Sequence, residues 1–260
     1  MARPLMFPKL ESPVAVAASQ TFYVPAALDM EQGRAAVEHA IKDSVLRPFD
    51  IARNARVEDV APLWVPFWRF EVAVEGFYFD VSDVTVGSKG RTVPLPTGGG
   101  RYKNAVVMVC ARTDFPHQPK LPSLFGRVTG IHPLEVRADE LVPEPSPEVL
   151  LANDAVIVDA DVNRERAESI ATELLLREVS PTHAMYATYE PRMEAGAFCL
   201  YPLYYARYTY SGEARRHPDE QLFVAVSGKT GEVVAAAYPS AARSVAAKIR
   251  RLLSFDRRGA

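Results

Sequence analysis

Two segments combine glycine with basic side chains, a combination that can hold a phosphate group. The first spans residues 87–103 and contains four basic side chains: Lys89, Arg91, Arg101 and Lys103. It lacks the Gly-Lys-Ser/Thr ending of a phosphate-binding loop, so we expect a hairpin loop there, with an anion site as the alternative. The second segment, Gly228-Lys229-Thr230, has that ending, but strand-like residues precede it where the motif needs its first glycine. We interpret the second segment as a turn.

The other reactive side chains have no spacing that predicts catalysis or metal binding. Cys110 and Cys199 each lie in an apolar run, which is typical of a buried thiol rather than of a zinc knuckle. The five histidines are dispersed, and none is paired on a helix with another metal ligand. A Gly-x-Ser-x-Gly nucleophile elbow is also missing. The sequence therefore predicts no catalytic residue, no metal site and no cofactor.

Residues 240–260 are basic, whereas the rest of the chain is acidic overall. They contain six basic side chains and one acidic side chain, whereas the whole chain has a formal charge of −2. The basic side chains surround an apolar helical stripe, so we expect a terminal helix docked on its own domain or, alternatively, bound to anionic lipid or an acidic partner. The candidate partner- or membrane-binding residues are Arg243, Lys248, Ile249, Arg250, Arg251 and Leu252.

An aromatic phrase that occurs twice indicates how these segments are positioned. In residues 65–76 and again in residues 201–212, a proline lies ten positions before a glycine, and large apolar side chains alternate between them. A period of two predicts a strand that starts at the proline and buries one face in a sheet core. An exposed contact surface is the alternative. Among the aromatic side chains, Tyr205 is the best candidate for exposure, because it falls on the face of Arg207.

A predicted helix precedes each aromatic phrase. Asp29 and Gln32 have the spacing of a capping box, and an apolar stripe follows them until Pro48. In the second half, Asp161 or Asn163 can cap a helix that ends before Pro181. The apolar positions of the two helices are Val37, Ile41 and Val45 in the first, and Ala167, Ile170, Ala171, Leu174 and Leu175 in the second.

These elements predict a duplicated chain. We expect a flexible lead (1–19), a first half (20–115), a proline-rich linker (116–154), a second half (155–239) and the basic tail (240–260). The predicted fold class is α+β, with two pseudo-symmetric strand-helix-strand-strand halves, each a helix packed on an antiparallel sheet.

The order of the motifs also resembles a known family. The residues that carry it are Arg34-Ala35-Ala36, Leu63–Trp68, Leu141-Val142-Pro143, Arg166-Ala167-Glu168, Leu200–Tyr205 and Gly228–Val233. Over residues 20–240 the chain resembles uncharacterised bacterial proteins that are loosely labelled zinc-ribbon or replication-factor-Y-like. It lacks their zinc ribbon and the C-terminal transmembrane helices that many of them have. The resemblance implies a shared scaffold, in some relatives at a membrane, and it implies no catalytic residue.

Composition and charge narrow the function classes. A net charge of −2 gives no global basic field, so a nucleic-acid partner ranks third. No window approaches the roughly 18 apolar residues of a membrane span, and two cysteines fit a reducing compartment. We therefore expect a non-enzymatic cytoplasmic interaction or scaffold protein with a protein partner, recruited to a membrane surface or larger assembly by its basic C-terminal helix. The alternative is a small-molecule-binding protein or enzyme with a cleft between the two halves.

Overall fold

The computed structural model describes most of the chain between residues 20 and 239. The described residues are 20–43, 48, 50–86, 91–113, 127–128, 134, 136–143, 155–180, 185–211 and 222–239, with the backbone alone for 43, 82–86, 91, 92, 101, 127 and 128. The predicted lead (1–19) and the predicted basic helix (240–260) lie outside this part. So do Lys89 and the tail candidates Arg243, Lys248, Ile249, Arg250, Arg251 and Leu252.

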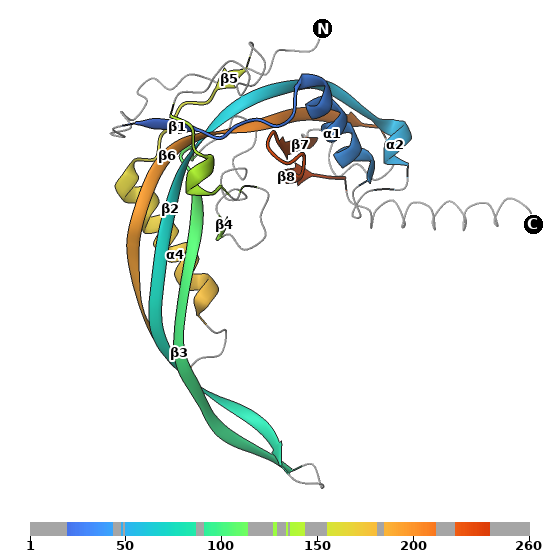
Figure 1. Ribbon diagram of the computed structural model, residues 1–260. Helices are drawn as coiled ribbons and strands as arrows, with labels where there is room; N and C mark the ends of the chain where they lie inside the picture. Colours follow the sequence, from blue (N-terminus) through green and yellow to red (C-terminus); the bar gives the residue numbers. More distant parts are fainter. Residues whose placement is uncertain are drawn as a thin grey trace, which may run out of the picture.

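One sheet, mostly antiparallel, organises the described residues. Its order is β4-β3-β2-β6-β7-β8, and β1 and β5 pair in parallel with β6 and β2 off this path. The strands are β1 (Thr21–Tyr23), β2 (Ala55–Val86), β3 (Arg91–Cys110), β4 (Arg127–Val128), β5 (Val156–Ile157), β6 (Tyr186–Tyr210), β7 (Leu222–Ser227) and β8 (Val233–Ala237). The helices are α1 (Met30–Asp43), α2 (Ile51–Asn54), the 3-10 helix η1 (Ala138–Glu140) and α4 (Arg164–Val179). Figure 1 shows β2, β3 and β6 as a long arch.

The predicted α+β class is confirmed, but the sheet differs from the expectation of one sheet per half. β2 and β6, which come from different predicted halves, pair from Ala55–Tyr210 to Phe79–Tyr186. Their pairing joins all the strands into one sheet. The predicted start of each strand at its proline is also wrong, because β2 begins at Ala55 and β6 at Tyr186.

The first aromatic phrase changes its edge partner at Pro66. The Trp64 carbonyl accepts a bond from the Val158 amide (2.9 Å), and the Pro66 carbonyl accepts one from the Ala111 amide (2.8 Å). Beyond Pro66 the edge partner is β3. Two residues that are opposite in this way in an antiparallel pair normally exchange both N–H···O bonds, but Pro66 has no N–H to donate to the Ala111 carbonyl. The Ala111 carbonyl in turn accepts bonds from the two residues that precede the α4 N-cap, at 2.8 and 3.0 Å.

The second aromatic phrase has the same arrangement at Pro202. The Leu200 carbonyl accepts a bond from the Val24 amide (3.0 Å), and the Pro202 carbonyl accepts one from the Gly228 amide (2.8 Å). The Gly228 carbonyl then accepts bonds from Ala27 and Leu28, the residues just before the N-terminus of α1, at 2.9 and 3.0 Å. Each proline therefore lies where one edge partner ends and the next begins.

Both helices cover the same face of the sheet, where each buries part of its predicted apolar stripe. The capping box is confirmed, since the Gln32 amide donates to Asp29 Oδ1 (2.8 Å) and the Asp29 amide donates to Gln32 Oε1 (3.0 Å). At α4 the cap is Asn163, whose Oδ1 accepts from the Arg166 amide at 3.0 Å. The helix residues buried against this face are Val37, Ala40 and Ile41 of α1 and Ala167, Ala171, Leu175 and Val179 of α4.

The opposite face is covered by segments without long helices. Arg69 is buried there, and its Nε donates to the Val136 carbonyl at 2.6 Å while Nη2 pairs with Glu71 at 2.8 Å. Val136 belongs to the predicted linker, part of which is thus a cover for the sheet. Tyr205 is only 4% exposed and packs in this second core, so its predicted exposure is wrong. Alternation identifies two faces but does not tell whether the second face is covered.

Trp68 offers a direct test of the helix-covered core. Its side chain is 2% exposed, its Nε1 donates to the Val162 carbonyl (2.9 Å), and its ring lies 5.1 Å from that of Phe198. We expect Trp68→Ala to lower the free energy of unfolding in urea by about 3–5 kcal/mol, because it removes both packing and a buried hydrogen bond. The control Ile157→Ala, at an exposed position of β5, should change it by less than about 0.5 kcal/mol. Equal effects of the two substitutions would contradict this account of the core.

Candidate functional site

The sheet projects beyond its covered centre as an arm. We define the arm as residues 74–86 of β2, 91–103 of β3 and 186–191 of β6, which pair with one another in continuous register. Beyond Phe79 only β2 and β3 continue. In Figure 1 the arm points away from α1 and α2.

One face of the arm is braced by the end of α4. The Tyr189 hydroxyl donates to the Val179 carbonyl at 3.2 Å, and Lys103 Nζ is ion-paired with Glu178. Val74, on the same face, is fully buried. The body end of this face is therefore covered by α4, whereas Leu95, nearer the tip on the same face, is 42% exposed.

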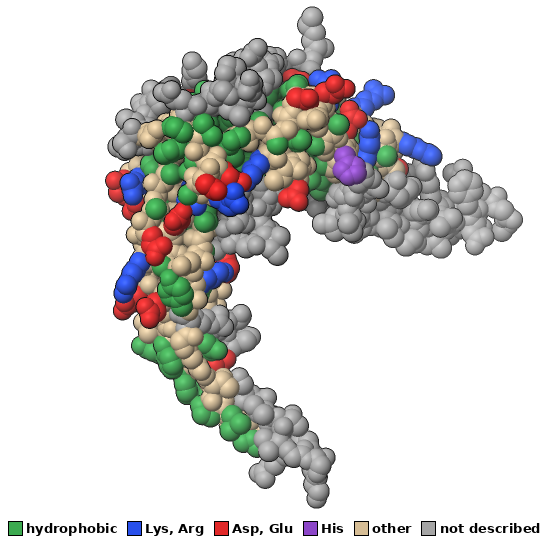
Figure 2. Space-filling model, viewed as in Figure 1, with side chains coloured by type: hydrophobic (Ala, Val, Ile, Leu, Met, Phe, Trp, Pro, Cys, Tyr) green, Lys and Arg blue, Asp and Glu red, His purple; other side chains and the backbone are tan. Residues whose placement is uncertain are grey.

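The other face of the arm exposes five large apolar side chains, which we call the aromatic face. They are Phe77, Phe79, Val81, Tyr102 and Tyr186, and each is between 37% and 66% exposed. The register places them together, because Phe79 is opposite Tyr186 and Glu75 is opposite Tyr102. Figure 2 shows hydrophobic side chains gathered along this end of the molecule. Apolar side chains scattered singly are ordinary on a surface, whereas a contiguous group is typical of a contact site.

Glycines in β3 allow the aromatic side chains to lie close to the strand. Gly98 is opposite Phe79. A Cβ at Gly98 would lie 2.7 Å from the Tyr78 carbonyl oxygen and 3.5 Å from the tip of the Phe77 ring. The ring thus lies over a position where a side chain would crowd it. The glycines shape this surface as well as allowing the strand to continue.

A pair of carboxylates lies at the body end of the aromatic face. Glu75 of β2 is directly opposite Glu190 of β6, and both are exposed. Tyr102 is opposite Glu75 on its other side, and Phe77 is two residues further along β2. The face therefore changes from acidic to apolar toward the tip of the arm.

The predicted anion loop is a strand over most of its length. Arg91, Arg101 and Lys103 all belong to β3, so the prediction of a loop fails from residue 91 onward. The cause is the continuous pairing of β3 with β2, which carries the strand through its glycines. Lys103 is neutralised by Glu178, and the three residues are spread along the strand rather than gathered around one point. Only the backbone is described at Arg91 and Arg101, so the anion site stays a prediction.

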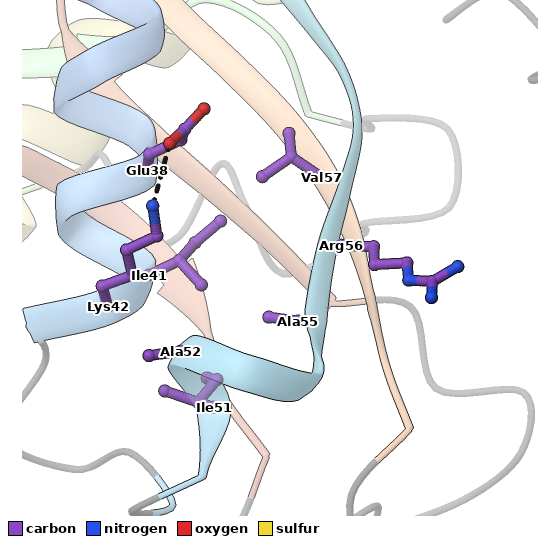
Figure 3. Close-up of a pocket in the computed structure, with 8 residues that line it drawn as sticks. All are labelled: Glu38, Ile41, Lys42, Ile51, Ala52, Ala55, Arg56 and Val57. Carbon is purple, nitrogen blue, oxygen red and sulfur yellow. Dashed lines mark hydrogen bonds and ion pairs between the residues drawn. The ribbon is translucent and has the colours of Figure 1, made fainter.

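A hollow of about 490 Å³ lies between α1, α2 and the start of β2 (Figure 3). Ile41, Ile51 and Val57 give it an apolar lining, and Arg56 points away from it. Glu38 and Lys42 form an ion pair at its rim (2.9 Å), which is a common surface pair of a helix. The hollow can admit an apolar group, and the acid and the base at its rim are paired with each other. It also lies within the first predicted half, not between the halves.

The buried reactive groups have structural roles. Burial raises the pKa of the Cys110 and Cys199 thiols to about 12, which keeps both protonated near neutral pH. Ser227 is fully buried and bonds to the Tyr201 hydroxyl at 2.7 Å. Its Oγ also accepts from the amides of Lys229 and Thr230, at 3.1 and 3.0 Å. The Gly228-Lys229-Thr230 segment is therefore the predicted turn.

An ion pair also joins this turn to the 3-10 helix η1. Lys229 Nζ lies 2.7 Å from Glu140 Oε2. Burial raises the pKa of Glu140, but the hydrogen bond and charge of Lys229, with the backbone amide of Arg137, outweigh burial and hold that pKa below its ordinary value. Within the described ranges, no group of three or more His, Cys, Asp or Glu could hold a metal ion, and no helix there could cross a membrane.

The burial of both cysteines predicts slow thiol chemistry. We expect native protein at pH 8 to react with Ellman's reagent at least about a hundred times more slowly than protein unfolded in guanidinium, since the thiolate is the reactive form and it is scarce and shielded. Absorbance of the released thionitrobenzoate gives both rates. A rapid reaction of one thiol equivalent in the native protein would show that Cys110 or Cys199 is accessible.

Comparison of the chain with models of known families, with curated proteins and with solved structures finds no match. The function must therefore be argued from the side chains described above. Of these, the aromatic face is the largest group of apolar side chains without a cover among the described residues.

Proposed function

We propose that the protein is a non-enzymatic interaction or scaffold protein that binds a protein partner through the aromatic face of the arm. The observation that carries the proposal is the unequal cover of the arm, with α4 against the body end of one face and five exposed apolar side chains on the other. A sheet that is meant to face water normally alternates apolar and polar side chains. On the arm, the apolar side chains of this alternation lie on the face that is exposed.

The size of the aromatic face suits the centre of a protein interface. An aromatic side chain buries roughly 200 Å², so Phe77 and Phe79, which are 47% and 37% exposed, leave about 95 and 75 Å² to be covered, together worth about 4 kcal/mol. A standard interface buries about 800 Å² per partner. The five side chains would form its apolar centre, and the polar side chains around them its rim.

We further propose that the fold is an internal duplication in which the two halves exchange their strand-helix segments. Support comes from the matched bonds at Pro66 and Pro202, in which the segment before α4 bonds to the first half and the segment before α1 bonds to the second. The two aromatic phrases also meet at equivalent residues, since Val65 is opposite Tyr201. Such an exchange explains why a single sheet contains both halves.

A cytoplasmic location and recruitment to an anionic membrane by the basic C-terminal segment complete the proposal. It rests on the sequence of that segment, whose basic side chains include Arg250 and Arg251 beside Ile249 and Leu252. The family resemblance, which includes relatives at a membrane, agrees with this role.

The partner-binding role is tested by removing the apolar centre. We expect the double substitution Phe77→Ser and Phe79→Ser to reduce partner recovery at least about tenfold in affinity purification from the native host, because hot-spot aromatics dominate an interface. Quantitative mass spectrometry provides the measurement. Ile157→Ser, an equally drastic change at an exposed residue outside the arm, should leave recovery unchanged. Identical protein sets for the three forms, all with the same far-UV circular dichroism, would refute binding through the aromatic face.

The membrane role has a separate test. We expect deletion of residues 241–260 to abolish co-sedimentation with anionic vesicles, since the deletion removes six basic side chains and the apolar stripe. Neutral phosphatidylcholine vesicles are the control and should bind neither form. If full-length and truncated protein sediment equally with anionic vesicles, the tail does not recruit the protein.

A further inference from the structure

From the charge distribution on the aromatic face, and resting on the proposed function, we infer that the bound partner segment is basic. One of its Lys or Arg side chains lies between Glu75 and Glu190, against the ring of Tyr102, and its apolar side chains cover Phe77 and Phe79.

Two negative charges, those of Glu75 and Glu190, lie directly opposite each other on the arm. Directly opposite residues of an antiparallel pair have Cβ atoms about 5 Å apart, and like charges in these positions destabilise the sheet. Glu75 and Glu190 occupy such positions and are exposed. Among the described residues neither makes an ion pair.

The basic side chains that the structure describes nearest along the strands form no ion pair with Glu75 or Glu190. Lys103 is on the opposite face of the arm with Glu178, and Arg69 is committed to Glu71 and the Val136 carbonyl. Arg192 is opposite Ala73, two residues along β6 from Glu190 toward the covered centre of the sheet. It forms no ion pair with Glu190 in the structure. A cation from outside the described residues would relieve the repulsion between the two carboxylates.

The neighbouring side chains define what kind of cation fits. Tyr102 is the most exposed member of the aromatic face, and a ring beside two carboxylates favours a cation that can also stack, as Lys and Arg do. The long stem of such a side chain can lie on Phe77 while its charged end reaches the carboxylates. The same carboxylates repel phosphate, which disfavours nucleic acid and anionic lipid on this face.

The order of the side chains along the aromatic face also sets the direction of the partner segment. Same-face residues along a strand are about 7 Å apart. From the covered centre of the sheet to the tip of the arm, the side chains on this face are first Glu75 and Glu190, then Phe77, and then Phe79 beside Tyr186. A complementary segment is basic where it meets the body end and apolar toward the tip, in alternate residues if it is extended.

Synthetic peptides of alternating arginine and leucine, and of alternating glutamate and leucine, are the probes, titrated against the full chain by fluorescence anisotropy. We expect the arginine peptide to bind at least about tenfold more tightly. The double substitution Glu75→Gln and Glu190→Gln should remove this preference. The matched control, Glu31→Gln with Glu165→Gln, removes two exposed carboxylates outside the arm and should retain the preference.

The outcomes separate this inference from the proposal on which it rests. Equal binding of the two peptides, no binding of the arginine peptide, or an unchanged preference in the Glu75→Gln, Glu190→Gln protein overturns the basic partner. The proposed function is judged separately, by the partner recovered from the host with Phe77→Ser and Phe79→Ser. If that recovery falls while the peptides show no preference, the aromatic face still binds a protein but not a basic segment.

Discussion

The pairing of β2 with β6 is the constraint on which the other elements depend. A strand of 32 residues needs partners for its backbone groups along its whole length, and β6 supplies them from Ala55 to Phe79. This pairing aligns the two aromatic phrases at Val65 and Tyr201. The remaining strands attach at the outer edges, where Pro66 and Pro202 mark the changes of partner.

The arm follows from the unequal lengths of the paired strands. β6 starts at Tyr186, opposite Phe79, so β2 and β3 continue alone toward the tip. A two-stranded ribbon has little cover of its own. The end of α4 braces one face through Val179 and Glu178, and the side chains of the aromatic face are left exposed. In this arrangement the sheet holds a group of apolar side chains at an exposed position.

Local features were predictable because their causes lie close together in the chain. The Asp29 capping box, the Asn163 cap and the turn at Gly228 each depend on residues within a few positions. The aromatic face was not found from sequence. The glycines opposite Phe77 and Phe79 suggested a loop, and only the register shows that the strand continues through them. The alternation of Phe77, Phe79 and Val81 was the available signal.

The sequence by itself determined the α+β class, the helix caps and the alternation of the strands, because these depend on neighbouring residues. Only the tertiary structure decided which faces are covered. Tyr205 is buried and Phe77 is exposed, although both lie in alternating strands. The difference arises from segments far away in the chain, such as the one that brings Val136 to Arg69. Burial depends on which distant segment reaches a face, and no local pattern contains that information.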